Sequence, residues 1–592
     1  MKSSDYWMII LLLLLSILAL LPVSPIIQHI PPRDSGFFFY AGSRLLKGDL
    51  LYKNIWDDKP PMIFLINAFG LWISGGSRWG LWILELVSIW AAVWIAFTVL
   101  KGSFSQVAAI LGIISGLTIL LITLHGGNYT EEYAIPFQFA CLFFLVQAEQ
   151  KWGFWPAFAC GIAQGILVFL QQSFISIGIA ISLYLVLRSI LSHSWKPFRQ
   201  VVFIALGGLA VSSVFLAIMA VQGILPGFWD GAFVYGIVYS NLGLLEHLKA
   251  LGETLQFFKT IPLLLILIPV WLLALFLLLW HAAKIIAGIL KNRWTGWILL
   301  ACGILSLAAG ISANLLPGSR SGFGLLQQAA IALGVILTGL AILQLFNLLS
   351  RLALPALEKT TYTVSPASIT IIAVTVFWYP IEVVMINLSG RSFLHYYMAI
   401  CAVCAVLYAF LADQFQKAFH FAKPGKVNIL LASVWVIGMA LTLAHNPINT
   451  MRNFYTPGNG NNVWTEAVRY VVAHTQPDDE VLVWGSEPVV NFLSNRSSPV
   501  RYTYFYNTFY TEGYGGKTLS AELLNDLQTK KPVLIIYTGD TPFINITADH
   551  TCVMPVQPLP AGMEEVMKDI CSNYYYSEDI GSYGWKVYHI NN

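Results

Sequence analysis

The feature that most constrains the fold of this chain is the near absence of charge from most of its length. Only 11% of the 592 residues are charged, whereas 57% are hydrophobic. A soluble protein of this size needs more charge to cover its surface, so the composition predicts a polytopic α-helical membrane protein. Residues 6–28 contain no charged residue and offer about twenty apolar positions, enough to cross a bilayer. The run is too long for a signal peptide, and we expect a retained first helix.

Apolar runs bounded by charged or turn residues predict about thirteen membrane-spanning helices. A break at Gln171-Gln172 separates two of them. The predicted spans are residues 6–28, 79–100, 104–124, 131–148, 153–170, 173–191, 201–222, 260–283, 295–314, 324–349, 366–388, 394–412 and 428–446.

The balance of charge changes sign near the end of the apolar runs. Residues 1–447 carry 24 Lys and Arg against 15 Asp and Glu, whereas residues 448–592 carry 9 against 15. We therefore predict a transmembrane domain over 1–447 and a soluble domain over 448–592. The acidic second domain argues against a nucleic-acid partner.

The distribution of Lys and Arg predicts the orientation in the membrane. With the N-terminus in the cytoplasm, the predicted inner loops hold 14 basic residues and the outer loops hold 10, six of them in segment 29–78. An odd number of spans then places the C-terminal domain outside the cytoplasm, on the same side as segment 29–78. The expected location is the cell membrane.

The C-terminal domain has an alternating pattern of helices and strands. Short apolar strands are predicted at 481–484 and 533–537, and helices near 464–474, 488–493 and 521–527. This alternation predicts a small parallel sheet. The tyrosines at 574–576 suit either ordinary surface positions or carbohydrate contact. Cys552 and Cys571 are the only cysteines of this domain, and in an oxidising compartment they could pair.

Segment 29–78 concentrates polar chemistry at one face of the membrane. Two short helices are expected at the membrane surface within residues 34–76. Asp34 follows Pro31-Pro32 and opens the first of them. Its carboxylate suits a helix N-cap or, equally, a general base acting on a hydroxyl substrate. Before the second helix, Asp58 suits a cap or a ligand contact, and Asp57 is a further substrate-binding candidate. Lys59 could neutralise a phosphate.

A second set of polar residues is expected at the same face. Arg391 and His395 are four residues apart at the predicted start of a span, with Tyr396 beside them. On one helix face, near free N–H groups, this pair could hold a phosphate. The alternative is an interfacial anchor of arginine with tyrosine.

Acidic residues also occur at or within the predicted spans. Of Glu131 and Glu132, one could cap a helix while the other contacts substrate. Glu85 and Glu382 lie inside spans, where acids usually face a cavity or a partner, and both are candidates for lining a lipid groove. The outer loop 223–259, with Trp229, Asp230, Tyr235 and Tyr239, suits either a lid over a polar head group or an ordinary connection.

Four motifs together resemble glycosyltransferase family 39, the protein O-mannosyltransferase and aminoarabinose-transferase type within the GT-C group. The resemblance covers residues 1–447, and the C-terminal domain resembles the extracytoplasmic domain appended to many such enzymes. The motifs are Arg33-Asp34-Ser35-Gly36, Leu51-Tyr52-Lys53-Asn54-Ile55-Trp56-Asp57-Asp58-Lys59-Pro60-Pro61, Tyr129-Thr130-Glu131-Glu132-Tyr133 and Gly390-Arg391-Ser392-Phe393-Leu394-His395-Tyr396.

The resemblance implies transfer of a sugar from a polyprenyl-phosphate donor to an acceptor hydroxyl, with inversion. Asp34 matches the catalytic base, and Lys59, Arg391 and His395 match positions that stabilise phosphate. Many family members have Asp-Glu where this chain has Asp-Ser. A phosphate leaves without a strong general acid, so one base and several cations suffice, and we expect no metal and no cofactor beyond the donor. The expected partners are membrane lipid, the lipid-linked donor and an acceptor that is a lipid, glycan or protein.

Two other functions remain compatible with the sequence. A flippase or transporter of lipid-linked glycans would need a polar path through the spans, which hold few polar residues. A non-catalytic envelope assembly protein would use the C-terminal domain to bind glycans.

Overall fold

The computed structural model describes residues 3–289, 365–418 and 463–591, apart from positions 242, 548 and 582, together with residues 433, 435 and 437. The spans predicted at 295–314, 324–349 and 428–446 therefore lie outside the described residues or almost entirely so. Every other predicted span contains a helix. These helices are α1 (Ser3–Leu20), α4 (Trp79–Ser103), α5 (Gln106–Thr123), α6 (Thr130–Lys151), α7 (Phe154–Leu170), α8 (Ser176–Leu191), α9 (Trp195–Val221), α13 (Pro262–Ile289), α16 (Pro366–Ile386) and α17 (Cys401–Ala418).

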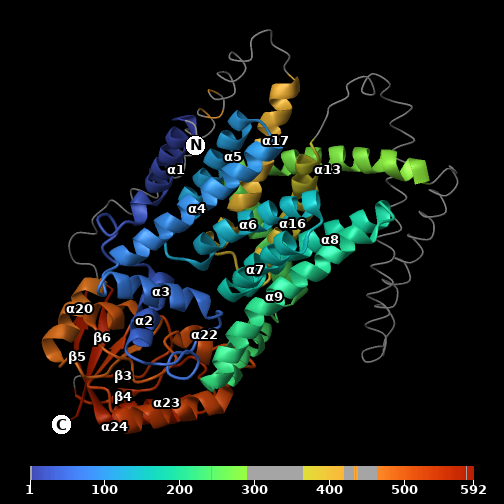
Figure 1. Ribbon diagram of the computed structural model, residues 1–592. Coiled ribbons are helices and arrows are strands. Elements are labelled where there is room, and N and C mark those ends of the chain that lie inside the picture. The colour runs from blue at the N-terminus through green and yellow to red at the C-terminus, as the bar shows by residue number, and fades with distance from the viewer. Residues whose placement is uncertain are drawn as a thin grey trace, which may run out of the picture.

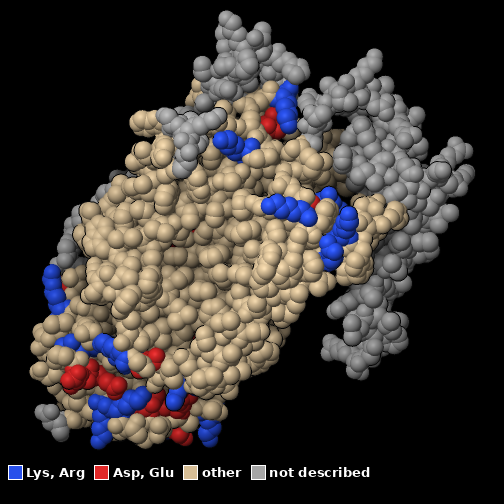
Figure 2. Space-filling model, in the orientation of Figure 1, with Lys and Arg blue, Asp and Glu red and all other residues tan. Residues whose placement is uncertain are grey.

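The distribution of charge over the surface is that of a membrane protein. Among the described helices, eight are long and apolar enough to cross a bilayer. Figure 2 shows a broad band without charged residues between a C-terminal end rich in both signs of charge and an opposite end where Lys and Arg predominate. The predicted polytopic helical fold with a C-terminal α/β domain is confirmed.

The predicted break between two spans is also present, and it positions part of the site. Helix α7 ends at Leu170, Gln171 is extended, and a 3-10 helix (Gln172–Ile175) leads into α8. The Gln172 amide donates to the carbonyl oxygens of Asp58 at 3.1 Å and Ala232 at 2.9 Å. The break thus places a polar side chain against two surface loops, which an unbroken apolar helix could not do.

Two short helices lie between α1 and α4, as expected. They are α2 (Arg33–Leu46) and α3 (Met62–Ile73). Eight consecutive residues of α2, from Ser35 to Gly42, are buried, so neighbours cover this helix on all sides. Figure 1 shows α2 and α3 between the membrane helices and the C-terminal domain.

The C-terminal domain is built on a mixed sheet, which corrects the predicted parallel one. The strand order is β1 (Val481–Trp484), β2 (Leu534–Tyr537), β6 (Trp585–Ile590) and β5 (Tyr574–Ile580). Only β1 and β2 are parallel; β6 is antiparallel to both of its neighbours. Strands β5 and β6 were not predicted, because neither contains a continuous apolar run like those of β1 and β2. The tyrosines at 574–576 therefore belong to a strand, and Tyr574 is buried.

Helices cover both faces of this sheet. Helix α20 (Val463–His474) packs on Val481, Val483 and Ile536, while α23 (Gly516–Lys530) and α24 (Met563–Asn573) pack on the opposite face. The remaining elements are α21 (Val489–Ser494), α22 (Phe505–Phe509) and the small antiparallel pair β3 (Asn545–Ile546) and β4 (Cys552–Val553). The predicted helices at 464–474, 488–493 and 521–527 correspond to α20, α21 and α23.

Cys552 and Cys571 form a disulfide, with Cα atoms 6.1 Å apart. The bond links β4 to α24 and closes a loop across 19 positions. We expect Cys552→Ser to lower the free energy of unfolding of this domain by roughly 2–4 kcal/mol, because the unfolded chain loses a cross-link. Denaturant unfolding followed by the fluorescence of the domain measures the change. Wild-type protein unfolded under reducing conditions should lose the same amount, and unequal losses would contradict the assignment.

Candidate functional site

A cavity of about 650 Å³ lies where α2, the loop before α3 and the C-terminal domain meet. Its wall includes all four residues that the sequence predicts to be catalytic or phosphate-binding, together with three predicted substrate contacts. These residues are Asp34, Lys59, Arg391, His395, Asp57, Asp58 and Tyr396. Residues separated by more than 350 positions thus share one site.

Asp34 lies in the first turn of α2 and does not cap the helix. Pro32 occupies the N-cap position with an extended backbone, and no side chain caps the end. The Asp34 carboxylate instead turns toward the cavity, with its side chain 33% exposed. Its Oδ1 accepts a hydrogen bond from Tyr504 Oη at 2.9 Å, and its Oδ2 is 3.9 Å from His395 Nε2. The N-cap alternative is therefore wrong.

Lys59 lines the cavity beside Asp57 and Asp58. Its backbone N–H donates to Asp57 Oδ1 at 2.9 Å, and its carbonyl accepts from Tyr52 Oη at 2.8 Å. Its ammonium lies 3.8 Å from Asp58 Oδ1. Burial lowers the pKa of Lys59, but the carboxylates of Asp58, Asp57 and Asp34 outweigh it and hold the pKa well above its usual value. The residue is therefore a permanent cation.

Asp57 and Asp58 have different surroundings. Asp58 lines the cavity and pairs with Lys59, while α3 begins behind Pro61 without a side-chain cap; the cap alternative for Asp58 is wrong. Asp57 is only 6% exposed. Burial raises the pKa of its carboxyl to about 8, although Lys59 opposes the shift.

This raised pKa predicts how stability depends on pH. The folded chain keeps the Asp57 proton at a pH where an unfolded aspartate, with a pKa of about 4, has lost it. The contribution of Asp57 to the free energy of unfolding therefore falls as pH rises from about 4 to about 8. We expect Asp57→Asn to raise the melting temperature in detergent at pH 8 and to change it less at pH 5. The exposed aspartate variant Asp478→Asn is the control, and an equal effect of Asp57→Asn at both pH values would refute the prediction.

Arg391 and His395 do not share a helix face, which corrects the predicted geometry. The 3-10 helix η6 (Leu394–Ile400) begins after Phe393, so Arg391 lies in the preceding loop. The Arg391 guanidinium is 4.4 Å from the centre of the Tyr239 ring. Among the described residues, no carboxylate forms an ion pair with it. The two side chains reach the same cavity from a loop and a helix, and Arg391 is available to an anion.

His395 is fixed by an aromatic stack that the sequence did not reveal. Its ring lies 4.3 Å from that of Tyr129 at an angle of 17°. Tyr129 Oη in turn lies 3.2 Å from Nδ1 of His125. Both Tyr129 and His125 line the cavity. Tyr129 is the first residue of the motif Tyr129-Thr130-Glu131-Glu132-Tyr133. That motif was the only sign in the sequence that Tyr129 belongs to the site.

A second cavity, of about 350 Å³, adjoins the first. Asp58, Tyr239 and Tyr396 line both of them. The further wall of the second cavity is largely apolar and carries two buried acids. The apolar residues include Phe174, Ile237, Met385, Ile386 and Leu388, and the acids are Glu131 and Glu382. The groove predicted for Glu382 is thus present, whereas Glu85 is buried elsewhere and accepts from the backbone N–H of Asn128.

Glu131 and Glu132 have different partners. Glu132 Oε1 accepts from the backbone N–H of Tyr129 at 3.0 Å, which caps α6. Glu131 accepts from Thr130 Oγ1 at 3.0 Å and faces the second cavity. Glu132 is therefore structural, and Glu131 remains a candidate contact.

The outer loop 223–259 folds over the two cavities. It forms α10 (Leu225–Trp229), a π-helix (Asp230–Tyr235), α11 (Gly236–Ser240) and α12 (Leu244–Thr260). Tyr235 and Tyr239 line the larger cavity, and Asp230 Oδ2 accepts from Tyr514 Oη of the C-terminal domain at 2.5 Å. The loop covers the site from the side of this domain, whereas Trp229 is exposed.

The C-terminal domain supplies a wall that the sequence did not predict. Ser486, Tyr504, Thr508 and Asp540 line the larger cavity. None of them carries a local motif, and only the docking of the domain on α2 brings them to Asp34.

One family model matches part of the chain. The family model described as dolichyl-phosphate-mannose-protein mannosyltransferase matches residues 58–218. The predicted resemblance to glycosyltransferase family 39, in the GT-C group, is confirmed over these residues. The match begins at Asp58 and spans the motif that contains Glu131. It indicates a glycosyltransferase.

The chain is also similar in fold to solved structures of two proteins. The oligosaccharyltransferase of Archaeoglobus fulgidus is 12% identical, with a TM-score of 0.48 over 97% of this chain and 78% of that one. ArnT from Cupriavidus metallidurans in the apo state is 12% identical, with a TM-score of 0.47 over 99% and 98%. The same enzyme bound to undecaprenyl phosphate is 10% identical, with a TM-score of 0.45 over 99% and 98%. No curated protein sequence matches the chain.

Proposed function

We propose that this protein transfers a sugar from a polyprenyl-phosphate donor to an acceptor hydroxyl at the outer face of the membrane, with inversion. The observation that carries the proposal is that the Asp34 carboxylate shares a cavity of about 650 Å³ with the cations Lys59 and Arg391. A base for a hydroxyl and cations for a departing anion are the two requirements of this reaction.

In the proposed step, Asp34 takes the proton of the acceptor hydroxyl as its oxygen attacks the anomeric carbon. The new carbon–oxygen bond forms on one face of the sugar while the bond to the phosphate oxygen breaks on the other. The electron pair of the broken bond leaves with the polyprenyl phosphate, whose charge Lys59 and Arg391 stabilise, with His395 beside them. Because phosphate is a good leaving group, the step needs no second carboxylate, metal or cofactor.

The second cavity supports a lipid-linked donor. It shares Asp58, Tyr239 and Tyr396 with the cavity that Lys59 and Arg391 line, and its further wall is largely apolar. An isoprenoid chain can lie there with its phosphate at Lys59 and Arg391. The family model that matches the chain names a donor of this kind, dolichyl phosphate mannose.

Two observations support a location of the site outside the cytoplasm. The Cys552–Cys571 disulfide is of a kind that persists in oxidising compartments. The end of the molecule opposite the C-terminal domain is rich in Lys and Arg, as cytoplasmic ends are.

Mass analysis of glycolipids and glycoproteins tests the proposal and identifies the acceptor. Cells that carry the wild-type gene, no gene or the Asp34→Asn variant are compared. We expect one glycan modification that is present only with the wild type. A modification that persists in the Asp34→Asn cells would exclude the proposed chemistry and favour the flippase alternative.

A further inference from the structure

The C-terminal domain touches the proposed catalytic base directly. Tyr504, in the segment before α22, donates its hydroxyl hydrogen to Asp34 Oδ1 at 2.9 Å. The Tyr504 ring also packs edge-on against Phe37, with centroids 5.3 Å apart. Burial and the charges of Asp34 and Asp57 hold the pKa of Tyr504 well above its usual value, so the hydroxyl keeps its proton and acts as the donor.

This contact leaves one carboxylate oxygen for chemistry. Asp34 Oδ1 is occupied by Tyr504, while Oδ2 faces His395 at 3.9 Å, beyond hydrogen-bond distance. A carboxylate held at one oxygen has a restricted side-chain rotation. Its other oxygen is then presented to the cavity in a constant direction, as a general base requires.

The neighbouring residue is held by the same domain. Arg33 donates from Nε at 3.1 Å and from Nη2 at 2.9 Å to Glu487 Oε1. Glu487 is 5% exposed and also accepts from Trp464 Nε1 at 2.8 Å. The Arg33 guanidinium therefore forms its ion pair with Glu487 of the C-terminal domain and not with Asp34.

These contacts belong to a stripe along the whole of α2. The stripe consists of Arg33, Gly36, Tyr40, Arg44 and Lys47, spaced three or four residues apart on one helix face. At Gly36 the two parts approach so closely that an added Cβ would lie 2.6 Å from the Cβ of Val489. Only glycine permits this approach.

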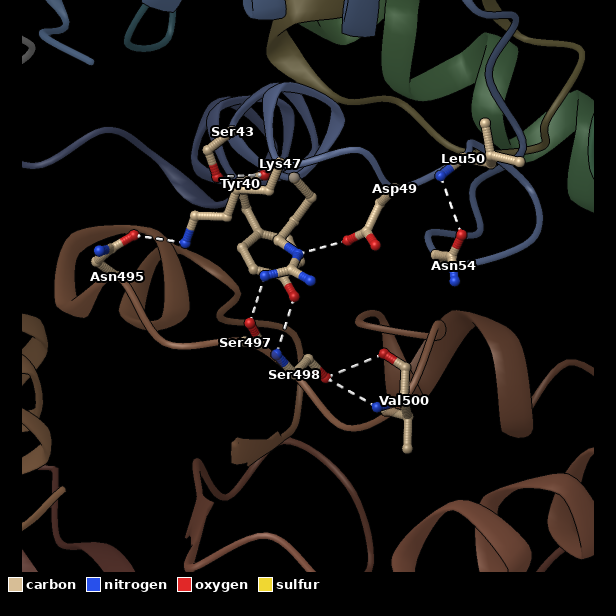
Figure 3. A network of polar contacts seen from close by, with 11 residues as sticks. Tyr40, Ser43, Lys47, Asp49, Leu50, Asn54, Asn495, Ser497, Ser498 and Val500 are labelled. Atoms are coloured by element: carbon tan, nitrogen blue, oxygen red, sulfur yellow. Dashed lines mark hydrogen bonds and ion pairs between the residues drawn. The ribbon is translucent and has the colours of Figure 1, made fainter. Parts of the chain in front are cut away.

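The far end of the stripe is polar. The backbone N–H of Ser498 donates to Tyr40 Oη at 2.9 Å, and Lys47 Nζ donates to Asn495 Oδ1 at 2.8 Å. Arg44 contacts Ser497 and pairs with Asp49 at 2.6 Å. Figure 3 shows Tyr40 and Lys47 pointing from α2 toward the segment that contains Asn495, Ser497 and Ser498. The register between α2 and the C-terminal domain is therefore fixed over several turns, and the Tyr504 contact is part of a continuous interface.

We propose that Tyr504 is a positioning residue for Asp34, so that the C-terminal domain completes the catalytic site. This inference rests on the proposed function. A domain that only bound glycans would not need to supply a hydrogen bond to the base.

The test is Tyr504→Phe, which keeps the ring and removes the hydroxyl. The probe is polyprenyl-phosphate-linked sugar isolated from membranes of the source cells, given together with an extract of those membranes that supplies the acceptor hydroxyl. The readout is the release of polyprenyl phosphate by purified full-length protein. We expect kcat to fall about 10- to 100-fold, the usual effect of one hydrogen bond to a charged group, with an unchanged KM for the donor. The acidic limb of the kcat–pH profile should move to higher pH, because a carboxylate that has lost a donor is protonated more readily.

Two further variants make the test specific. Tyr574→Phe removes the same hydroxyl from a tyrosine that donates to the Pro532 carbonyl in the domain core, and it should leave kcat and the pH profile unchanged. Glu487→Gln weakens the contact between Arg33 of α2 and the C-terminal domain without altering Asp34 or Tyr504. It should also lower kcat.

The outcomes separate this inference from the function on which it rests. If the wild type is active, Asp34→Asn is inactive and Tyr504→Phe keeps the wild-type kcat and pH profile, the positioning role is wrong and the proposed function stands. A Tyr504→Phe protein with a lower melting temperature but unchanged kcat overturns the role equally. If the wild type shows no release that depends on Asp34, both proposals fail.

Discussion

Asp34→Asn is expected to lower the rate of sugar transfer by about 10²- to 10⁴-fold, the usual contribution of a general base. The amide keeps the size and shape of the side chain and can still accept from Tyr504 Oη, but it cannot take a proton from a hydroxyl. Because Asp34 does not cap α2, the exchange should leave the fold intact. The measurement is polyprenyl phosphate release by purified protein, with the melting temperature determined on the same samples.

Asp49→Asn is the matched control for this exchange. Asp49 follows α2 on the same side of the molecule and pairs with Arg44, but it does not line the larger cavity. We expect its activity to stay close to that of the wild type. Equal activity of Asp34→Asn and Asp49→Asn would remove Asp34 from the mechanism.

The second large effect is expected for Lys59→Gln. The proposed reaction leaves a new negative charge on the polyprenyl phosphate, and the ammonium of Lys59 stabilises that charge in a partly buried site. We expect kcat/KM to fall by about 10²- to 10³-fold, as for the loss of one preorganised charge-stabilising group. Polyprenyl monophosphate should also raise the melting temperature of the wild type and fail to raise that of the variant.

The exposed Lys53 provides the control for Lys59, since it lies in the same loop. Lys53→Gln removes the same charge from the surface and should change neither kcat/KM nor the melting shift. If both variants bind polyprenyl monophosphate as the wild type does, the phosphate is held elsewhere and the assignment of Lys59 is wrong.

The membrane helices were predictable because each is a long apolar run with clear ends. The break at Gln171 and the two short helices before α4 were also visible, since polar residues and prolines interrupt the pattern there. Strands β5 and β6 were missed because neither is a continuous apolar run. The pairing of β6 with β2 also joins segments that are distant in the sequence.

The candidate site was predictable only in part. Asp34, Lys59, Arg391 and His395 were found through motifs, and they do line one cavity. The helical pairing of Arg391 with His395 was wrong, because the chain enters the helix only at Leu394. The contact of Tyr504 with Asp34 could not be predicted, because it forms only when two parts of the chain that are 470 positions apart pack together. No local pattern records such a contact.

The central claim is that this cavity binds a polyprenyl-phosphate sugar. Asp34 then takes a proton from the acceptor hydroxyl as polyprenyl phosphate leaves. The most direct test is the configuration of the transferred sugar, determined by NMR on the product made from a donor of known anomeric configuration. The account predicts an inverted anomeric centre with the wild type, and a rate of product formation about 10²- to 10⁴-fold lower with Asp34→Asn. A product of retained configuration would contradict it, because a single displacement with one base cannot yield retention.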